Sequence, residues 1–254
     1  MANYGVYSIL GSPREHGSTI ASCLIVNNCN GKHYYAKSEV GYTLAQSYDH
    51  SLKEKMGLVL YAMLGVKVPD SMILKLPIVY THKLYSNSLF GIDENRQDSY
   101  YLCTEIVGDQ LIEMATLIDN NMLVKLLVAG HVINDPDVFG SNMNNLRIDN
   151  ASKNKTVYKI DAGEAFSKIN DEELNQIRVM TQGSDTCIDI NKLDIKMQDS
   201  FNCQIRKVIA NEDMVSTNLK YHFSKKYYPT NQTQIQDCIT LLKHRFQYLR
   251  KTYK

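Results

Sequence analysis

The segment from residue 126 to residue 166 constrains the fold most, because two polar clusters lie in it between strand-like apolar residues. The first cluster starts at Asp135-Pro136-Asp137 and runs to Asn145-Leu146-Arg147-Ile148. The second is Val157-Tyr158-Lys159-Ile160-Asp161-Ala162-Gly163. A hairpin is expected to join the two clusters. Asp and Asn are also common turn formers, so a plain hairpin with polar turns is the alternative, and the upstream chain must decide between them.

The side-chain types in the two clusters fit phosphoryl transfer. That reaction needs one carboxylate to orient the attacking hydroxyl, and an amide oxygen with a second carboxylate to hold the magnesium that bridges the nucleotide phosphates. Magnesium prefers a few hard oxygen ligands and keeps several waters, so one carboxylate and one amide suffice. The clusters therefore favour a phosphotransferase that uses ATP and Mg²⁺.

The N-terminal residues predict a strand, a glycine-containing loop, a strand, a turn and a strand, at 4–10, 11–18, 20–26, 27–31 and 33–39. Glycines let backbone N–H groups approach phosphates, and a lysine on the third strand can reach the phosphates too. Two loop glycines are more often a simple turn, and a strand lysine is usually solvated, so the order of the elements carries the argument. The predicted nucleotide-binding residues here are Gly11, Ser12, Gly17, Ser18 and Lys37.

Residues 42–64 have helical periodicity, and Gly65 is the expected end of that helix. The apolar stripe consists of Leu52, Met56, Val59, Leu60 and Met63. Glu54 is the candidate partner of Lys37, and a solvated helix charge is the alternative interpretation.

The next residues predict one or two strands at 66–79 with a bend at Pro69, then a polar loop or insertion at 80–98. A strand over 100–107 is expected to bring backbone groups of Glu105 to Val107 to an adenine ring. Gly108 marks the expected lobe boundary. A helix or pair of helices is predicted at 110–129.

The pattern D-x-x-G-x-x-x-x-N from Asp137 to Asn145, followed by I-D-x-G with Asp161, resembles the catalytic and metal-binding segments of atypical kinases. The nearest families are the phosphatidylinositol 3-/4-kinase-like enzymes, HipA-type kinases and kinase-like effectors of intracellular bacteria. The resemblance implies an α+β, two-lobed kinase-like fold with a β-rich N-lobe at 1–108 and a mainly helical C-lobe at 109–254. It also implies that Asp137 is catalytic and that Asn145 and Asp161 bind the metal.

The sequence departs from the family pattern in three places. No His-Arg-Asp precedes the loop, the spacing to Asn145 is longer than usual, and Ala162 stands where Phe is usual. Asp135 therefore remains a rival to Asp137. Asn142, which has the usual spacing, and Asn144 remain rivals to Asn145. A catalytically inactive nucleotide-binding pseudokinase, or a kinase fold used for nucleotidylation, stays open.

The resemblance and a basic C-terminus favour a phosphoinositide substrate, and a HipA-like Ser/Thr protein kinase is the alternative. The last helix is predicted to bury Ile235, Cys238, Ile239, Leu242, Phe246 and Leu249. Its outer face carries Lys243, His244, Arg245, Arg250 and Lys251, preceded by Lys220, Lys225 and Lys226. Such a face fits an anionic membrane, and a solvated packing helix is the plainer interpretation. After residue 166, where phosphoinositide kinases offer basic side chains, only Lys168 and Arg178 are available.

Composition and charge restrict the partners and the cellular location that we expect. The 254 residues have a formal net charge of +1, so no nucleic-acid partner is expected. The six cysteines show no paired spacing, which favours reduced thiols. Without a secretory signal or a long apolar run, a cytoplasmic location is expected: the bacterial cytosol, or host cytosol and membrane surface if the chain is a secreted effector.

Overall fold

The computed structural model describes residues 3–4, 6–16, 20–39, 42–77, 98–108, 114–119, 122–140, 143–150, 155–166, 176–181 and 184–253. It shows a mixed α+β protein, as predicted. The chain divides into two compact units. Unit 1 comprises residues 1–55 and 69–106, and unit 2 comprises residues 56–68 and 107–254. The predicted division at residue 108 assigns residues 56–68 and 107–108 differently.

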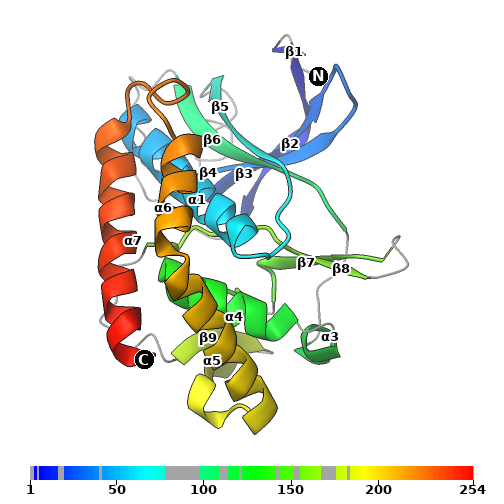
Figure 1. Cartoon of the computed structure of the whole chain (residues 1–254). Helices are drawn as coiled ribbons and strands as arrows, with labels where there is room; N and C mark the ends of the chain where they lie inside the picture. Colours follow the sequence, from blue (N-terminus) through cyan, green and yellow to red (C-terminus); the bar gives the residue numbers. More distant parts are fainter. Residues whose placement is uncertain are drawn as a thin grey trace. The chain divides into compact units, whose positions relative to one another are not determined.

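Unit 1 is built on a curled antiparallel sheet with the strand order β1-β2-β3-β4-β6-β5 (Figure 1). The strands are β1 (Asn3–Tyr4), β2 (Tyr7–His16), β3 (Ile20–Asn27), β4 (His33–Glu39), β5 (Ser71–Pro77) and β6 (Asp98–Glu105). Side chains of β4 alternate between buried and half-buried, so Tyr34 and Ala36 enter the core while Lys37 lies on the other face. The buried cluster of this sheet is Cys23, Ile25, Tyr34, Ala36, Leu76, Tyr101 and Cys103.

The predicted loop at 11–18 is wrong over residues 11–16, because β2 continues to His16. Pairing with β3 shifts register between Leu10 and Arg14, so the strand takes up the Gly-Ser-Pro sequence as a bulge and then resumes. A bulge removes the need for a ladder hydrogen bond from Pro13, which has no N–H. Gly11 and Ser12 thus lie in a strand, and Gly17 and Ser18 lie outside the described residues.

Helix α1 (Leu44–Met63) confirms the predicted helix. The stripe residues Leu52, Met56 and Leu60 are fully buried. Gly65, at φ +83°, ends the helix as predicted. Its N–H donates to the Ala62 carbonyl and the next N–H, of Val66, donates to the Tyr61 carbonyl, which is the Schellman pattern. The first turns of α1 belong to unit 1, and residues 56–63 belong to unit 2.

Unit 2 contains the pair of helices predicted after the strand β6, α3 (Met114–Asp119) and α4 (Met122–Ile133). Helix α4 is buried along nearly its whole length, so its apolar residues form the centre of this unit. The predicted hairpin between the two polar clusters is confirmed: β7 (Leu146–Asp149) pairs antiparallel with β8 (Thr156–Lys159). A second hairpin, β9 (Gln176–Thr181) and β10 (Ser184–Asp189), was not predicted.

Helices α5 (Ile195–Ala210), α6 (Glu212–His222) and α7 (Gln232–Thr252) complete unit 2, after a short 3₁₀ turn η2 (Ile190–Lys192) (Figure 1). All six apolar residues predicted for the buried face of α7 are buried. The placement of Arg245 on the outer face is wrong. Arg245 is buried, and its Nε donates to the His131 carbonyl near the end of α4, 2.7 Å away. A long aliphatic stem allows an arginine at the edge of an apolar stripe to be buried in this way.

Several predictions fall on residues outside the described ranges: the loop at 80–97, Asn142 and Lys168. Arg178 lies in β9. Among the described residues, no helix is both long and apolar enough to cross a membrane.

Candidate functional site

The first polar cluster begins where α4 ends. Asn134 adopts a left-handed conformation (φ +59°), which an Asn tolerates better than most residues. The N–H of Asp135 then donates to the Gly130 carbonyl over 2.9 Å, the longer bond of the Schellman pattern. Val138 and Phe139, both fully buried, anchor the loop that follows. The end of one buried helix thus fixes the path of the chain through Asp135 and Asp137.

Both carboxylate oxygens of Asp135 accept hydrogen bonds within unit 2. Its side chain is 1% exposed. Oδ2 accepts from the Tyr61 hydroxyl at 2.7 Å, and Oδ1 accepts from the Asp137 N–H at 3.0 Å. Lys159 Nζ lies 3.6 Å from Oδ2. A carboxylate with both oxygens occupied and no solvent contact is poorly suited to meet a substrate, so of the two rivals Asp137 is the better candidate.

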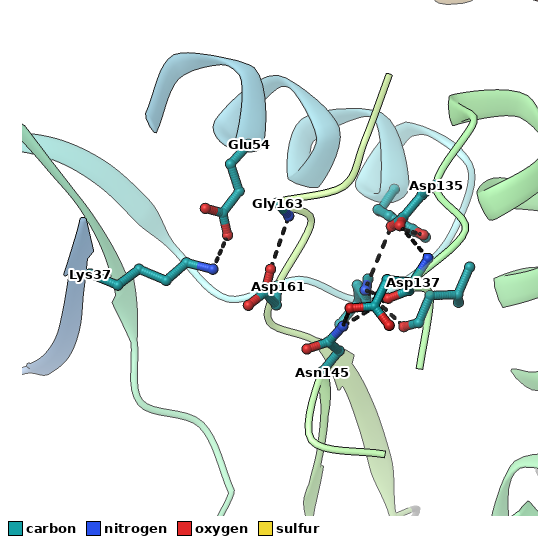
Figure 2. A network of polar contacts seen from close by, with 10 residues as sticks. Lys37, Glu54, Asp135, Asp137, Asn145, Asp161 and Gly163 are labelled. Atoms are coloured by element: carbon teal, nitrogen blue, oxygen red, sulfur yellow. Dashed lines mark hydrogen bonds and ion pairs between the residues drawn. The ribbon is translucent and has the colours of Figure 1, made fainter. Parts of the chain in front are cut away.

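Asp137 is half-buried and in direct contact with Asn145 (Figure 2). The Asn145 Nδ2 donates both to the Asp137 carbonyl, at 2.7 Å, and to the Asp137 carboxylate, at 3.1 Å. These two bonds orient the amide, because a nitrogen committed to Asp137 leaves the amide oxygen as the acceptor that is not used by Asp137. Of the rivals to Asn145, Asn144 is exposed, and Asn142 lies outside the described residues.

Gly140 is the position where this loop requires glycine. Its φ is +70°, and a Cβ there would come within 2.5 Å of the Asn145 Cγ and 2.7 Å of the Asn145 Oδ1. The side chain of Asn145 therefore packs directly against the backbone of Gly140. The loop holds Asn145 from both sides, by hydrogen bonds to Asp137 and by contact with Gly140.

The second polar cluster forms a turn in which the Gly163 N–H donates to Asp161 Oδ1 over 2.9 Å. Ala162 and Ala165 are buried, and Gly57 of α1 packs against both. A Cβ at Gly57 would lie 2.9 Å from the Ala162 Cβ and 2.7 Å from the Ala165 Cβ. Small residues are therefore needed both at position 57 of α1 and at positions 162 and 165 of the turn, which is a physical reason for Ala at position 162.

The acidic groups of the two clusters influence each other. Burial raises the pKa of the Asp137 carboxyl above its ordinary value, and the charges of Asp135 and Asp161 raise it further. The charge of Lys159 and the hydrogen bond from Asn145 oppose that rise in pKa. The carboxylates of Asp135, Asp137 and Asp161 are thus close enough for their charges to interact.

Unit 1 brings Lys37 and Glu54 together, although they are far apart in the sequence. Lys37 on β4 and Glu54 on α1 form an ion pair with 2.5 Å between Nζ and Oε1 (Figure 2). The Glu54 side chain is 1% exposed and that of Lys37 is 14% exposed. Such a buried carboxylate holds the lysine in one orientation, which a solvated helix charge would not do.

Part of the strand that is predicted to contact adenine makes hydrogen bonds and an ion pair with other residues of unit 1. The Glu105 N–H donates to the Asp70 carbonyl at 2.8 Å, and its carboxylate pairs with Lys32 at 3.0 Å. The Glu105 N–H is thus not available to a ligand. Val107 is half-buried just after β6, and Gly108 has φ +59°, where an added Cβ would meet the Ile148 carbonyl.

Two residues of the site were missed by sequence reasoning, Lys159 and Tyr61. Lys159 is fully buried and donates through Nζ to the carbonyls of Val138 and Asp137, at 2.7 and 3.3 Å. A signal for it was present, because strand alternation places Lys159 on the same face as the buried Val157. Tyr61 had no distinguishing signal within an apolar helix.

The chemistry of the donor set fits magnesium, which takes one or two carboxylates with other oxygen ligands and phosphates. Asn145 Oδ1 and the Asp161 carboxylate are the residues that would hold it. Within the described residues, no group of three or more His, Cys, Asp or Glu side chains is arranged to hold a metal ion. No protein-family model matches the sequence, and a search of curated proteins found no match.

Proposed function

We propose that this chain is a magnesium-dependent phosphotransferase that moves the γ-phosphoryl group of ATP to an alcohol. The observation that supports it most is the Asn145 amide, whose nitrogen is bound to Asp137 at both the carbonyl and the carboxylate. This arrangement presents an amide oxygen as a metal ligand beside a carboxylate that can accept a proton.

In the proposed reaction, the Asp137 carboxylate accepts the proton of the substrate hydroxyl. The hydroxyl oxygen forms a bond to the γ-phosphorus, the bond from that phosphorus to the bridging oxygen breaks, and ADP leaves with the electron pair. When bound, magnesium neutralises the developing phosphate charge. Asn145 and Asp161 hold oxygen ligands ready for it, and the hydrogen bond from Gly163 fixes the rotamer of Asp161.

The proposal assigns Lys37 to the nucleotide phosphates and Glu54 to the positioning of Lys37. The ion pair between them supports this assignment, because a lysine whose charge is held by a buried carboxylate keeps a fixed position for a ligand.

A phosphoinositide is the proposed acceptor. Its support is the exposed basic residues of unit 2, Lys220, Lys225, Lys226, Lys243, His244 and Lys251, which suit an anionic membrane surface. Two other basic residues contribute less, because Arg245 is buried and Arg250 pairs with Glu212.

Thermal unfolding with ATP, with and without magnesium, tests the nucleotide site. Saturating ligand is expected to raise the unfolding free energy by a few kcal/mol, about 2.7 kcal/mol at a hundredfold excess over Kd. Asp161→Ala should lose the magnesium-dependent part. Glu164→Ala, an exposed acidic residue of the same segment, is the matched control and should keep it. No stabilisation of the wild type by ATP would refute the proposal.

Turnover then identifies the acceptor. Phosphate transfer to vesicles that contain phosphoinositides supports the lipid acceptor, whereas labelling of a protein mixture indicates a protein kinase. ATP binding without any turnover indicates a pseudokinase. Mass spectrometry of the product shows whether a phosphoryl or a nucleotidyl group has been transferred.

A further inference from the structure

A buried lysine lies directly beneath the loop that carries Asp137. Lys159 is 0% exposed, and its Nζ lies 3.6 Å from Oδ2 of Asp135, which is 1% exposed. That distance is too long for a direct hydrogen bond, so the attraction within this pair is electrostatic. Tyr61 completes the cluster: its hydroxyl donates to the same carboxylate oxygen, and its ring centroid lies 5.4 Å from the Lys159 Nζ.

The short hydrogen bonds of Lys159 go to the loop backbone instead. Nζ donates to the Val138 carbonyl at 2.7 Å and reaches the Asp137 carbonyl at 3.3 Å. The same Asp137 carbonyl also accepts from Asn145 Nδ2 at 2.7 Å. One backbone oxygen is thus shared between the buried lysine and the amide that is expected to bind the metal. A shift of this oxygen would move Asp137 and Asn145 together.

Stability alone is a poor reason for such a cluster. Burying two charges costs several kcal/mol per ion, and apolar residues of similar volume often stabilise a fold equally well or better. Apolar residues, however, cannot donate hydrogen bonds to two adjacent carbonyls. What the lysine adds is therefore a fixed backbone geometry at Asp137.

We infer that Lys159 and Asp135 are positioning residues for the proposed reaction: Lys159 holds the backbone of Asp137 and Val138, and Asp135 balances its charge. This inference rests on the proposed function for its catalytic consequence. Its structural half, that Lys159 fixes the loop, stands on the contacts alone. The experiment therefore needs one readout that depends on activity and one that does not.

The variants separate charge balance from positioning. Lys159→Met keeps the length of the side chain but leaves Asp135 without the opposing charge of Lys159, and it can fail to fold for that reason. Lys159→Met combined with Asp135→Asn removes both charges and should unfold at nearly the wild-type temperature. Asp135→Asn alone keeps both backbone hydrogen bonds from Lys159. Lys67→Met is the matched control, because Lys67 is exposed and pairs with the neighbouring strand through its backbone carbonyl, which the substitution keeps.

Hydrogen exchange gives the readout that does not depend on activity. In the double variant, exchange of the amides at 135–140 and 143–146 should be faster by about tenfold or more, with α7 unchanged, because the buried Val138 carbonyl has lost its donor. Lys67→Met should leave those amides unchanged. Wild-type exchange rates at 135–140 and 143–146 in the double variant would overturn the inference.

Turnover gives the second readout. The double variant should lose kcat by on the order of 100-fold, with the KM for ATP unchanged, because a displacement of about 1 Å has that effect on a reacting group. In an Asp137→Asn background the same two substitutions should cause no further loss. An equal loss in both backgrounds, or full kcat in the double variant, would overturn the inference. Absence of turnover in the wild type would refute the proposed function, and hydrogen exchange would then decide the positioning role by itself.

Discussion

Gly140→Ala tests whether the loop of the first cluster holds Asn145 by direct contact. Gly31→Ala is the matched control, because both glycines have φ +70° and a Cβ at Gly31 would meet nothing within 4 Å. The strain of an alanine in the left-handed region, about 1–2 kcal/mol, is thus common to both variants. Any difference between the two losses of stability reports the contact at Gly140.

The size of that difference follows from the distances. The new Cβ would lie 2.5 Å from the Asn145 Cγ, against an ordinary separation of about 3.5–4.0 Å between carbon atoms. The new Cβ would also meet the Asn144 Oδ1, but Asn144 can turn away because its side chain is exposed. Asn145, in contrast, is buried and bonded to Asp137. The overlap of about 1 Å therefore moves Asn145 or the loop, and such overpacking costs about 1–3 kcal/mol beyond the strain.

Urea unfolding of both variants measures the difference, and thermal unfolding with ATP and magnesium measures its consequence. Gly140→Ala should lose more stability than Gly31→Ala and should also lose the magnesium-dependent stabilisation by ATP. Gly31→Ala should keep that stabilisation. Equal losses of stability in the two variants, with the magnesium effect intact in both, would refute the packing of Asn145 against Gly140.

Three further predictions concern residues within unit 1 or within unit 2. Gly57→Ala gains about 1 kcal/mol of helix propensity but overlaps Ala162 and Ala165, so it should be destabilising in urea, and a second substitution, Ala165→Gly, should restore stability. The pKa of Asp137 is raised, so between the ordinary value of about 4 and the raised pKa the native state binds a proton that the unfolded chain has lost. Stability should therefore fall as pH rises through that range, and Asp137→Asn should abolish the fall in urea titrations, while it lowers turnover. Lys37→Met should cost about 3–5 kcal/mol because it removes the cation beside the buried Glu54 carboxylate, and a second change, Glu54→Gln, should recover most of that loss.

Much of the fold follows from local patterns in the sequence. The stripe of α1 with Gly65 behind it, the alternation of β4, the hairpin between the two polar clusters and the buried face of α7 are all short-range signals. The extension of β2 to His16 was missed because a Gly-Ser-Pro sequence usually ends a strand, and here the sheet takes it up as a bulge. Arg245 was misplaced for a similar reason: charge suggests exposure, but a long stem allows burial.

The residue pairs of the candidate site are harder to predict from the sequence, because they depend on tertiary contacts. The partner of Lys37 was predicted from the order of elements, and the structure places Glu54 against it. No sequence pattern, however, indicates that Tyr61 and Lys159 meet at Asp135. Only the fold brings together a helix, a loop and a strand that lie up to about a hundred residues apart.

Asp135 and Asp137 show why the sequence left that choice open and what decides it. The two carboxylates are two residues apart in the same turn and have side chains of the same length. Their difference comes from direction: the Asp135 side chain turns inward to Tyr61 and Lys159, and its Oδ1 accepts the Asp137 N–H. That bond fixes the backbone of Asp137, whose own side chain meets Asn145. Asp135 thus has a structural role, because it fixes the backbone position of Asp137. Replacing Asp135 should therefore reduce turnover through Asp137 and have little effect on turnover once Asp137 has been removed.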